Sequence, residues 1–395
     1  MGMRILIISN LYPPHVLGGY EILCHQVVSY LLERGHQVHV LTSDHGQAPS
    51  DEPITRTLKV YQGFEKSASF MRMARYRCAA HNYRQTQKYL KTHDFDVVFV
   101  WSLLRLTPAS AHAVQKQRLP MVYTFNDENI SSFCAHAFSW NIKGAVHWFL
   151  DRFVMPKITL EGLDFTYTTS ISALLKRNLI AKKVPVSSSR VIYQGIPVEK
   201  FPLKEKPGAL HSPIRVLYAG QLHHYKGVHT IFKAMGRLVG NASMPSLHLT
   251  VAGKGPEEYT QELLRLSEEL KVDTSFIGSI AHEKMSGLYQ EHDIFVFPSI
   301  WEEPFGLTHL EAMASGLPVI STANGGQGEF LVNGQNSLVF EAEDDKGLAD
   351  ALQSLINDEA LRMNLIEEGR RVVCQSFSFE RYVDELQALL AEACH

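Results

Sequence analysis

The sequence has no long hydrophobic run, and its charges nearly balance. No stretch approaches the roughly 18 consecutive apolar residues of a membrane-spanning helix, and the short apolar start at Ile5 to Ile8 predicts a strand instead of a signal peptide. The formal net charge is only −3 over 395 residues. Such a balance argues against a surface devoted to nucleic acid, so any anion-binding site must be local.

Cysteines are few and metal-ligand patterns are missing. The five cysteines lie far apart, and an odd number fits reduced thiols in the cytoplasm. The histidines show no HExxH or similar spacing. Asp94-Phe-Asp96 has the form of a two-aspartate metal signature, but it precedes its strand, so it predicts a turn. We therefore expect no metal and no other cofactor.

Short apolar segments alternate with helical patterns, which is typical of parallel sheets covered by helices. The first series of expected strands is 4–9, 37–42, 96–101, 120–124, 165–169 and 190–193, and the second is 214–218, 247–252, 274–277, 294–298, 318–322 and 337–340. We predict an α/β protein with two Rossmann-like, doubly wound domains facing a central cleft. Residues 1–198 form the first domain and 199–378 the second, and an amphipathic helix at 379–395 crosses back to the first.

The most informative motif runs from Glu303 to Glu311, after the expected strand 294–298. Pro304 suits a first helical turn, and Gly306 lets a ligand approach backbone amides that attract phosphate. Eight residues at the helical rise separate the carboxylates by about 12 Å. One can then accept hydrogen bonds from a ribose and the other from a sugar beyond the phosphates. Alone, the pair also fits one surface acid and one helix-face acid.

Three glycine-bearing segments follow other expected strands, and ligands bind beyond the carboxyl ends of such strands. Gly18-Gly19 exposes backbone at the start of a helix, although a simple turn is the other explanation. Between Gly220 and Gly227 stands Lys226, which can neutralise a diphosphate or can be a solvated surface lysine. The Gly325-Gly326 loop comes immediately after the helix that carries Glu311, so we expect it to border the same pocket.

Together these motifs resemble those of the family 4 retaining glycosyltransferases of the GT-B fold. The likeness covers almost the whole chain, including the linker 191–201, and is strongest in the second half. It implies sugar transfer from a nucleotide-diphosphate donor to an acceptor hydroxyl, with retention of configuration and without a metal. The implied catalytic residues are Lys226, Glu303 and Asn126. The implied donor-binding residues are Gly18, Gly19, Gln221, Lys226, Glu303, Phe305, Gly306, Leu307, Thr308 and Glu311, and the acceptor-side residues are Glu21 and Asp127.

The resemblance also assigns roles, and two positions depart from it. It places the donor sugar at Glu303, the ribose at Glu311 and the diphosphate at Lys226 with the amides near 306–308. The family usually has arginine where this chain has Gln221, which leaves Lys226 to neutralise more of the diphosphate. The family often has histidine where this chain has Asn126. The asparagine side chain cannot carry a proton as histidine can. Asn126 fits a front-face mechanism in which the departing phosphate oxygen takes the acceptor's proton, although His15 or His223 can still assist.

The expected acceptor side is less distinctive. Residues 67–93 contain no acids, and basic and aromatic residues alternate there. This pattern fits a helix that binds an anionic acceptor, a helix on a membrane surface, or an ordinary solvated face. The aromatic residues of 133–153 can stack on a sugar, touch lipid or pack in the core; these are Phe138, Trp140, Trp148 and Phe149, with His147 among them.

The leading prediction is a retaining, metal-independent hexosyltransferase in polysaccharide or glycoconjugate biosynthesis. Family frequency alone favours UDP-glucose as donor, and the acceptor is a glycan or a lipid-linked glycan. The expected location is the cytoplasm, with or without peripheral contact to the inner membrane face, and no nucleic acid partner is expected. Two alternatives remain: a noncatalytic sugar-nucleotide-binding protein, suggested by Gln221 and Asn126, and a sugar-nucleotide epimerase of similar fold.

Overall fold

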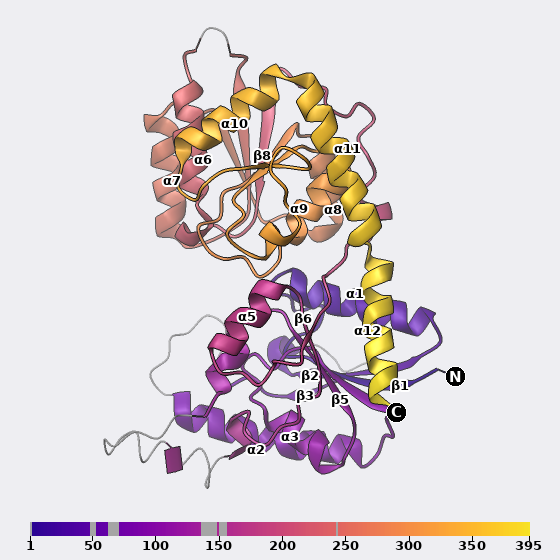
Figure 1. Cartoon of the computed structure of the whole chain (residues 1–395). Coiled ribbons are helices and arrows are strands. Elements are labelled where there is room, and N and C mark those ends of the chain that lie inside the picture. Colours follow the sequence, from indigo (N-terminus) through magenta and orange to yellow (C-terminus); the bar gives the residue numbers. More distant parts are fainter. Residues whose placement is uncertain (1, 48–52, 62–70, 136–147, 150–155, 242–243) are drawn as a thin grey trace. The chain divides into compact units, whose positions relative to one another are not determined.

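The computed structural model describes residues 2–47, 53–61, 71–135, 148–149, 156–241 and 244–395 (Figure 1). The chain divides into two compact units, Met1–Ile192 with Val383–His395 and Tyr193–Tyr382. The boundary after Ile192 lies before the one expected at 198, because the intervening segment packs within the second unit. Its Ile196 forms a β-bridge with Ser378, and the Tyr193 ring stacks on Phe305 with centroids 5.8 Å apart.

The first unit contains a parallel sheet of seven strands in the order β3-β2-β1-β4-β5-β6-β7. The strands are β1 (Arg4–Ile8), β2 (Gln37–Ser43), β3 (Ile54–Leu58), β4 (Val97–Val100), β5 (Met121–Phe125), β6 (Tyr167–Ser170) and β7 (Arg190–Val191). The sequence predicts all of them except β3. This edge strand carries Arg56 at its centre, so it lacks an apolar run, yet Arg56 is buried and its Nη1 donates to the Tyr12 carbonyl at 3.2 Å.

Helices cover both faces of this sheet. They are α1 (Gly19–Glu33), α2 (Met71–Leu90), α3 (Ala109–Lys116) and α5 (Ala173–Ala181), and α12 (Phe379–Ala393) joins them from the far end of the chain. Figure 1 shows α2 and α3 along one face and α1 and α12 along the other. Because both faces are covered, β1 and β4 are buried throughout their apolar residues, which explains their continuous hydrophobic runs.

The second unit contains a parallel sheet of six strands in the order β10-β9-β8-β11-β12-β13. The strands are β8 (Ile214–Ala219), β9 (Leu247–Ala252), β10 (Thr274–Gly278), β11 (Ile294–Phe297), β12 (Val319–Ser321) and β13 (Leu338–Val339). The helices are α6 (Val228–Leu238), α7 (Glu257–Glu269), α8 (His282–Gln290), α9 (Leu307–Ser315), α10 (Asp345–Asn357) and α11 (Glu359–Ser376). Helices α6, α7 and α10 form one group of packed neighbours, and α8, α9 and α11 form another.

Each sheet reverses its winding direction once, between β1 and β4 in the first unit and between β8 and β11 in the second. Loops that leave the carboxyl ends of strands beside such a reversal separate from one another and leave room for ligands. In the second unit these loops carry Lys226 after β8 and Glu303 after β11. In the first unit they carry Gly18 and Gly19 after β1 and the residues that follow Val100 after β4, and the loop that follows Phe125 leaves the next strand, β5. The topology therefore gives each unit one favoured edge for binding.

Helix α12 belongs to both units, and its bounds, Phe379–Ala393, lie within the predicted range 379–395. Phe379 to Tyr382 are part of the second unit, and the rest is part of the first. Its apolar face buries Val383, Leu386 and Leu390, and the Arg34 Nη1 of α1 contacts the Asp384 carboxylate at 2.5 Å. The helix is therefore the second covalent connection between the units, after the one at Ile192.

Candidate functional site

The site in the second unit is centred on an ion pair between Lys226 and Glu303. The Lys226 Nζ lies 2.6 Å from Oε1 and 2.7 Å from Oε2 of Glu303, and the Ser299 hydroxyl donates to Oε1 at 2.6 Å. Both charged side chains are buried, so Lys226 is not a solvated surface lysine. A buried carboxylate with three close hydrogen bonds from two donor groups is held firmly, because desolvation makes the loss of these partners unfavourable.

The lysine is positioned by a short 3-10 helix, η6 (His224–Lys226), that follows β8. Gly227 ends it with a left-handed φ of 67°, and a Cβ there would lie 2.1 Å from the Pro298 carbonyl oxygen. Glycine is therefore required where this loop crosses the end of β11. Aromatic rings surround the ammonium, with the Trp301 and Tyr225 centroids 5.4 Å and 5.6 Å from Nζ.

The amino end of α9 follows Glu303 closely in the sequence, but the helix begins later than predicted. It starts at Leu307 after the cap residue Gly306, so Pro304 is in the preceding loop, and the 12 Å helical spacing does not apply to Glu303 and Glu311. No side chain of the described residues caps this helix, so the first amides, at Leu307 and Thr308, keep their capacity to bind an anion. Gly306 has a φ of 128°, which explains why the loop needs glycine there.

Glu311 lies within α9 and is held by two residues that the sequence analysis missed. The Tyr289 hydroxyl donates to its Oε2 at 2.9 Å, and the His282 Nε2 lies 3.2 Å from its Oε1. Both partners belong to α8, seven positions apart and therefore on one face of that helix. The sequence carries no signal that identifies them, because it does not show that α8 packs against α9.

Two other predicted donor-binding residues do not bring their side chains to this pair. Phe305 is buried in an aromatic cluster with Phe330 and Phe377, whose ring centroids lie 5.4 Å and 5.9 Å away. Its side chain therefore packs the core, and only its backbone can take part in binding. Gln221 is exposed, and its carbonyl accepts a hydrogen bond from the Tyr218 hydroxyl at 2.8 Å.

In the first unit, the Glu21 side chain binds the backbone of the loop that precedes α1. Its Oε2 accepts hydrogen bonds from the amides of Gly18 at 3.0 Å and Leu17 at 3.2 Å, so it caps the start of α1. The predicted acceptor-side role of Glu21 stays a prediction, and the structure shows that one oxygen of its carboxylate holds the loop backbone. The Gly18 amide is likewise bound by Glu21, whereas Gly19 is exposed with open space where a Cβ would stand.

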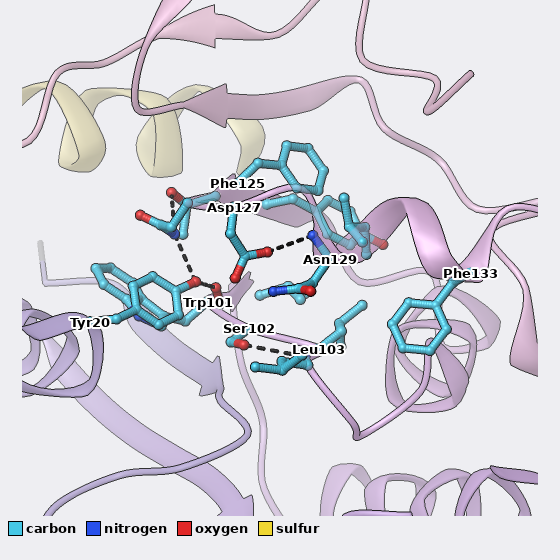
Figure 2. Close-up of a pocket in the computed structure, with 14 residues that line it drawn as sticks. Tyr20, Trp101, Ser102, Leu103, Phe125, Asp127, Asn129 and Phe133 are labelled. Carbon is cyan, nitrogen blue, oxygen red and sulfur yellow. Dashed lines mark hydrogen bonds between the residues drawn. The ribbon is translucent and has the colours of Figure 1, made fainter. Parts of the chain in front are cut away.

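The other predicted residues of the first unit do meet in a pocket at the carboxyl edge of β4 and β5 (Figure 2). The Asn126 amide nitrogen lies 2.7 Å from the Tyr20 hydroxyl, which in turn donates to the Trp101 carbonyl. Asp127 Oδ1 accepts from the Asn129 amide at 2.8 Å. Burial raises the pKa of Asp127, because the protein around it solvates the charged carboxylate poorly.

The described residues bear on metal binding and on membrane crossing. The described parts of the chain contain no group of three or more metal-ligating side chains. Asp96 of the two-aspartate sequence accepts from the Arg4 backbone amide and from Arg4 Nη2, both at 2.7 Å, so it has a structural role. Among the described helices, none has the length and apolar character needed to cross a bilayer.

The basic helix α2 behaves in part as an ordinary packed helix. It buries Cys78, Asn82 and Thr86, while Arg77 and Arg84 are exposed. The Arg75 guanidinium lies 4.9 Å from the centroid of the Phe133 ring. Of the aromatic residues considered for acceptor binding, Phe138 and Trp140 lie outside the described residues together with His147, whereas the Phe149 side chain is exposed.

Two doubly wound units, each with polar residues at the carboxyl edge beside its winding reversal, define the GT-B class of fold. Solved structures agree: the Anabaena protein HepE in complex with UDP-glucose superposes with a TM-score of 0.72 at 17% identity, over 99% of this chain and 100% of that one. Sucrose-phosphate synthase from Thermosynechococcus elongatus also gives a TM-score of 0.72, at 21% identity, over 99% and 98% of the two chains.

The family follows from the sequence comparisons. The model "Glycosyl transferases group 1" matches residues 199–372, and "Glycosyltransferase Family 4" matches residues 17–200. The chain belongs to the family 4 glycosyltransferases. It is 28% identical to the glycogen synthase of Mycobacterium tuberculosis, over 96% of this chain and 92% of that protein, and 24% identical to an uncharacterized glycosyltransferase of Methanocaldococcus jannaschii, over 97% and 96%.

Proposed function

We propose that this glycosyltransferase moves a hexose from a nucleotide diphosphate to a hydroxyl of a glycan or glycolipid, with retention of configuration and without a metal. The observation that carries the proposal is the buried Lys226–Glu303 pair, whose glutamate shortly precedes the uncapped start of α9 in the chain. It offers a cation and backbone amides for a diphosphate and a carboxylate for sugar hydroxyls. UDP-glucose is the favoured donor, because the solved relative HepE carries it and a full-length relative is a glycogen synthase.

In this proposal the charge that develops on the leaving diphosphate is stabilised by Lys226 and the amides of Leu307 and Thr308. Preorganised donors of this kind commonly supply a factor of about 10² to 10³ in rate for each donor. Glu303 and the phosphate both contact the Lys226 ammonium, and Glu303 also accepts hydrogen bonds from the sugar hydroxyls. Glu311, farther along α9, accepts from the ribose. Gln221 brings no second cation, so the lysine is the main positive charge at the diphosphate.

No strong protein base is required in this scheme. Asn126 has no proton to exchange, and burial lowers the pKa of His309 to about 3, so that buried imidazole is a weak base. The proton of the acceptor hydroxyl passes to the departing phosphate oxygen. The pocket around Asn126 and Asp127 is the proposed acceptor-side surface of the first unit, where polar groups lie beside aromatic rings (Figure 2). The unpaired cysteines fit a reducing compartment and support a cytoplasmic location.

The test is incubation of the purified protein with UDP-glucose, UDP-galactose and ADP-glucose, with nucleoside diphosphate release as the readout. We expect slow donor hydrolysis without acceptor and faster release with a glucan or glycolipid acceptor, unaffected by EDTA. NMR of the product would show the anomeric configuration of the donor. Binding without release would contradict an enzyme, interconversion of sugars would indicate an epimerase, and loss of activity with EDTA would contradict metal independence.

A further inference from the structure

The contacts of Glu311 on α8 lead beyond the roles that the sequence motifs provide. His282 lies at the first position of α8 and Tyr289 near its end, and each contacts a different oxygen of the same carboxylate. Only 6% of the Glu311 side chain is exposed, against 24% for His282. Helix α8 thus provides one hydrogen-bond donor for each oxygen of the Glu311 carboxylate.

An ionised carboxylate has about four lone-pair positions on its two oxygens. One bond to each oxygen fixes the plane of the group and leaves one position on each oxygen for another donor. Two vicinal hydroxyls of a ribose match that remaining pair. An unconstrained glutamate would have to give up side-chain freedom on binding them. Glu311, held by its two contacts on α8, has already lost that freedom in the folded protein.

We propose that His282 and Tyr289 are positioning residues that hold Glu311 in the orientation that recognises the two hydroxyls of a nucleotide ribose. The inference rests on the proposed function, in which Glu311 binds the ribose, and adds the two residues that make this binding selective. Neither residue has to touch the nucleotide. Their effect is specific to ligands that carry the hydroxyls.

The contacts of Tyr289 and His282 with Glu311 respond differently to pH. Burial and the Glu311 charge raise the pKa of Tyr289 well above its ordinary value, so its hydroxyl remains a donor. The hydrogen bond to Glu311 raises the pKa of His282, and the charges around it are Glu283 on α8 and Lys200 of the short helix η5 (Val198–Lys200). A raised histidine pKa means that the charge-assisted contact is present at low pH and weakens as the pH rises through that pKa.

The test compares UDP with 2′,3′-dideoxy-UDP, which keeps the base and both phosphates, by calorimetric titration of the full chain. We expect His282→Ala to weaken UDP binding about tenfold, within the range for a hydrogen bond to a charged group, and to leave dideoxy-UDP binding within twofold. Tyr289→Phe should act in the same direction. His282→Gln restores a donor and should recover most of the UDP affinity.

A matched control exists in the same unit. His248 Nδ1 lies 2.9 Å from the Asp273 carboxylate, and its side chain is 23% exposed, but the pair is outside the site. His248→Ala should leave both affinities unchanged. In the wild type, the affinity for UDP divided by that for dideoxy-UDP should fall with rising pH, and in His282→Gln it should stay constant. Phosphate ionisation affects both ligands equally and cancels in this ratio.

The outcomes separate the inference from the function on which it rests. Equal loss of both ligands in His282→Ala, or no loss of either, would overturn the positioning role while leaving a nucleotide-binding protein. If wild-type protein binds none of UDP, ADP and GDP, the proposed function fails and the inference fails with it. If ADP or GDP binds in place of UDP, the same comparison is made with its dideoxy form.

Discussion

The two units share one strand order, apart from the additional edge strand β7 of the first, but the residues at their binding edges differ. In the second unit, the edge at β8 and β11 carries buried charges that are already paired, with Lys226 bound to Glu303 and Glu311 bound from α8. In the first unit, the pocket after β4 and β5 is lined by side-chain amides, hydroxyls and a single carboxylate, Asp127, among aromatic rings. A charged, preformed edge suits a ligand of fixed chemistry such as a diphosphate. A mostly neutral edge has few buried charges to keep paired, so a few substitutions can change which ligand it binds.

The largest effect is expected from breaking the charged edge. Lys226→Ala should reduce sugar transfer by about 10² to 10³-fold, because the main cation at the leaving group is lost. It should also destabilise the second unit by about 3 kcal/mol, because Glu303 stays buried without its counter-charge. Kinetics and thermal unfolding measure the two losses separately.

A double variant distinguishes those losses. Lys226→Met combined with Glu303→Gln should recover most of the stability while transfer stays low, and Lys284→Ala, an exposed lysine on α8, is the control for charge removal. Near-normal transfer by Lys226→Ala would remove the lysine from the mechanism.

Glu303→Gln should have the next largest effect and should split binding from transfer. Removing the carboxylate frees the Lys226 ammonium for phosphate, so UDP should bind as tightly as in the wild type or tighter. Transfer from UDP-glucose should fall about 10- to 100-fold, because a hydrogen bond from the sugar to a charged acceptor is lost. Titration with UDP and steady-state rates test this, and a variant that loses UDP affinity would contradict the shared lysine.

Tyr20→Phe addresses the neutral edge of the first unit. It removes the hydroxyl that joins the Asn126 amide to the Trp101 carbonyl. We expect about 1 kcal/mol of stability to be lost and the KM for acceptor to rise, whereas UDP affinity stays constant, because that ligand is assigned to the other unit. Denaturant unfolding and two-substrate kinetics provide the measurement. A change in UDP affinity would show that the two edges are not separable.

The smallest effect is expected at Asp96, on the opposite edge of the first sheet. The hydrogen bond from Arg4 lowers the pKa of Asp96, so its charged form stabilises the fold above the unfolded pKa near 4 and loses that contribution as the pH falls. Asp96→Asn should lower Tm by at most about 2 °C at pH 7, since the pair is largely exposed. The difference should shrink in melts between pH 5 and pH 3, and a difference that grows there would contradict the ion pair.

Much of the fold could be read from the sequence because parallel strands buried on both faces are continuously apolar. That pattern predicts twelve of the thirteen strands found in the described residues and fails for β3, where Arg56 is buried by bonding to backbone carbonyls. In the site, the motif identifies Lys226 and Glu303, but their mutual contact depends on the crossing of two loops. His282 and Tyr289 escaped notice because isolated polar residues on a helix say nothing about the helix that packs on them.

Helix α12 has a consequence for how the protein is made. It is synthesised after the whole second unit, yet its apolar face, including Leu386 and Leu390, completes the core of the first. The second unit is continuous in the chain and can mature during translation. The first must wait with part of its core uncovered until the ribosome has passed residue 393. A fragment ending at Ile192 would retain that exposed surface permanently and should aggregate unless α12 is supplied as a separate peptide.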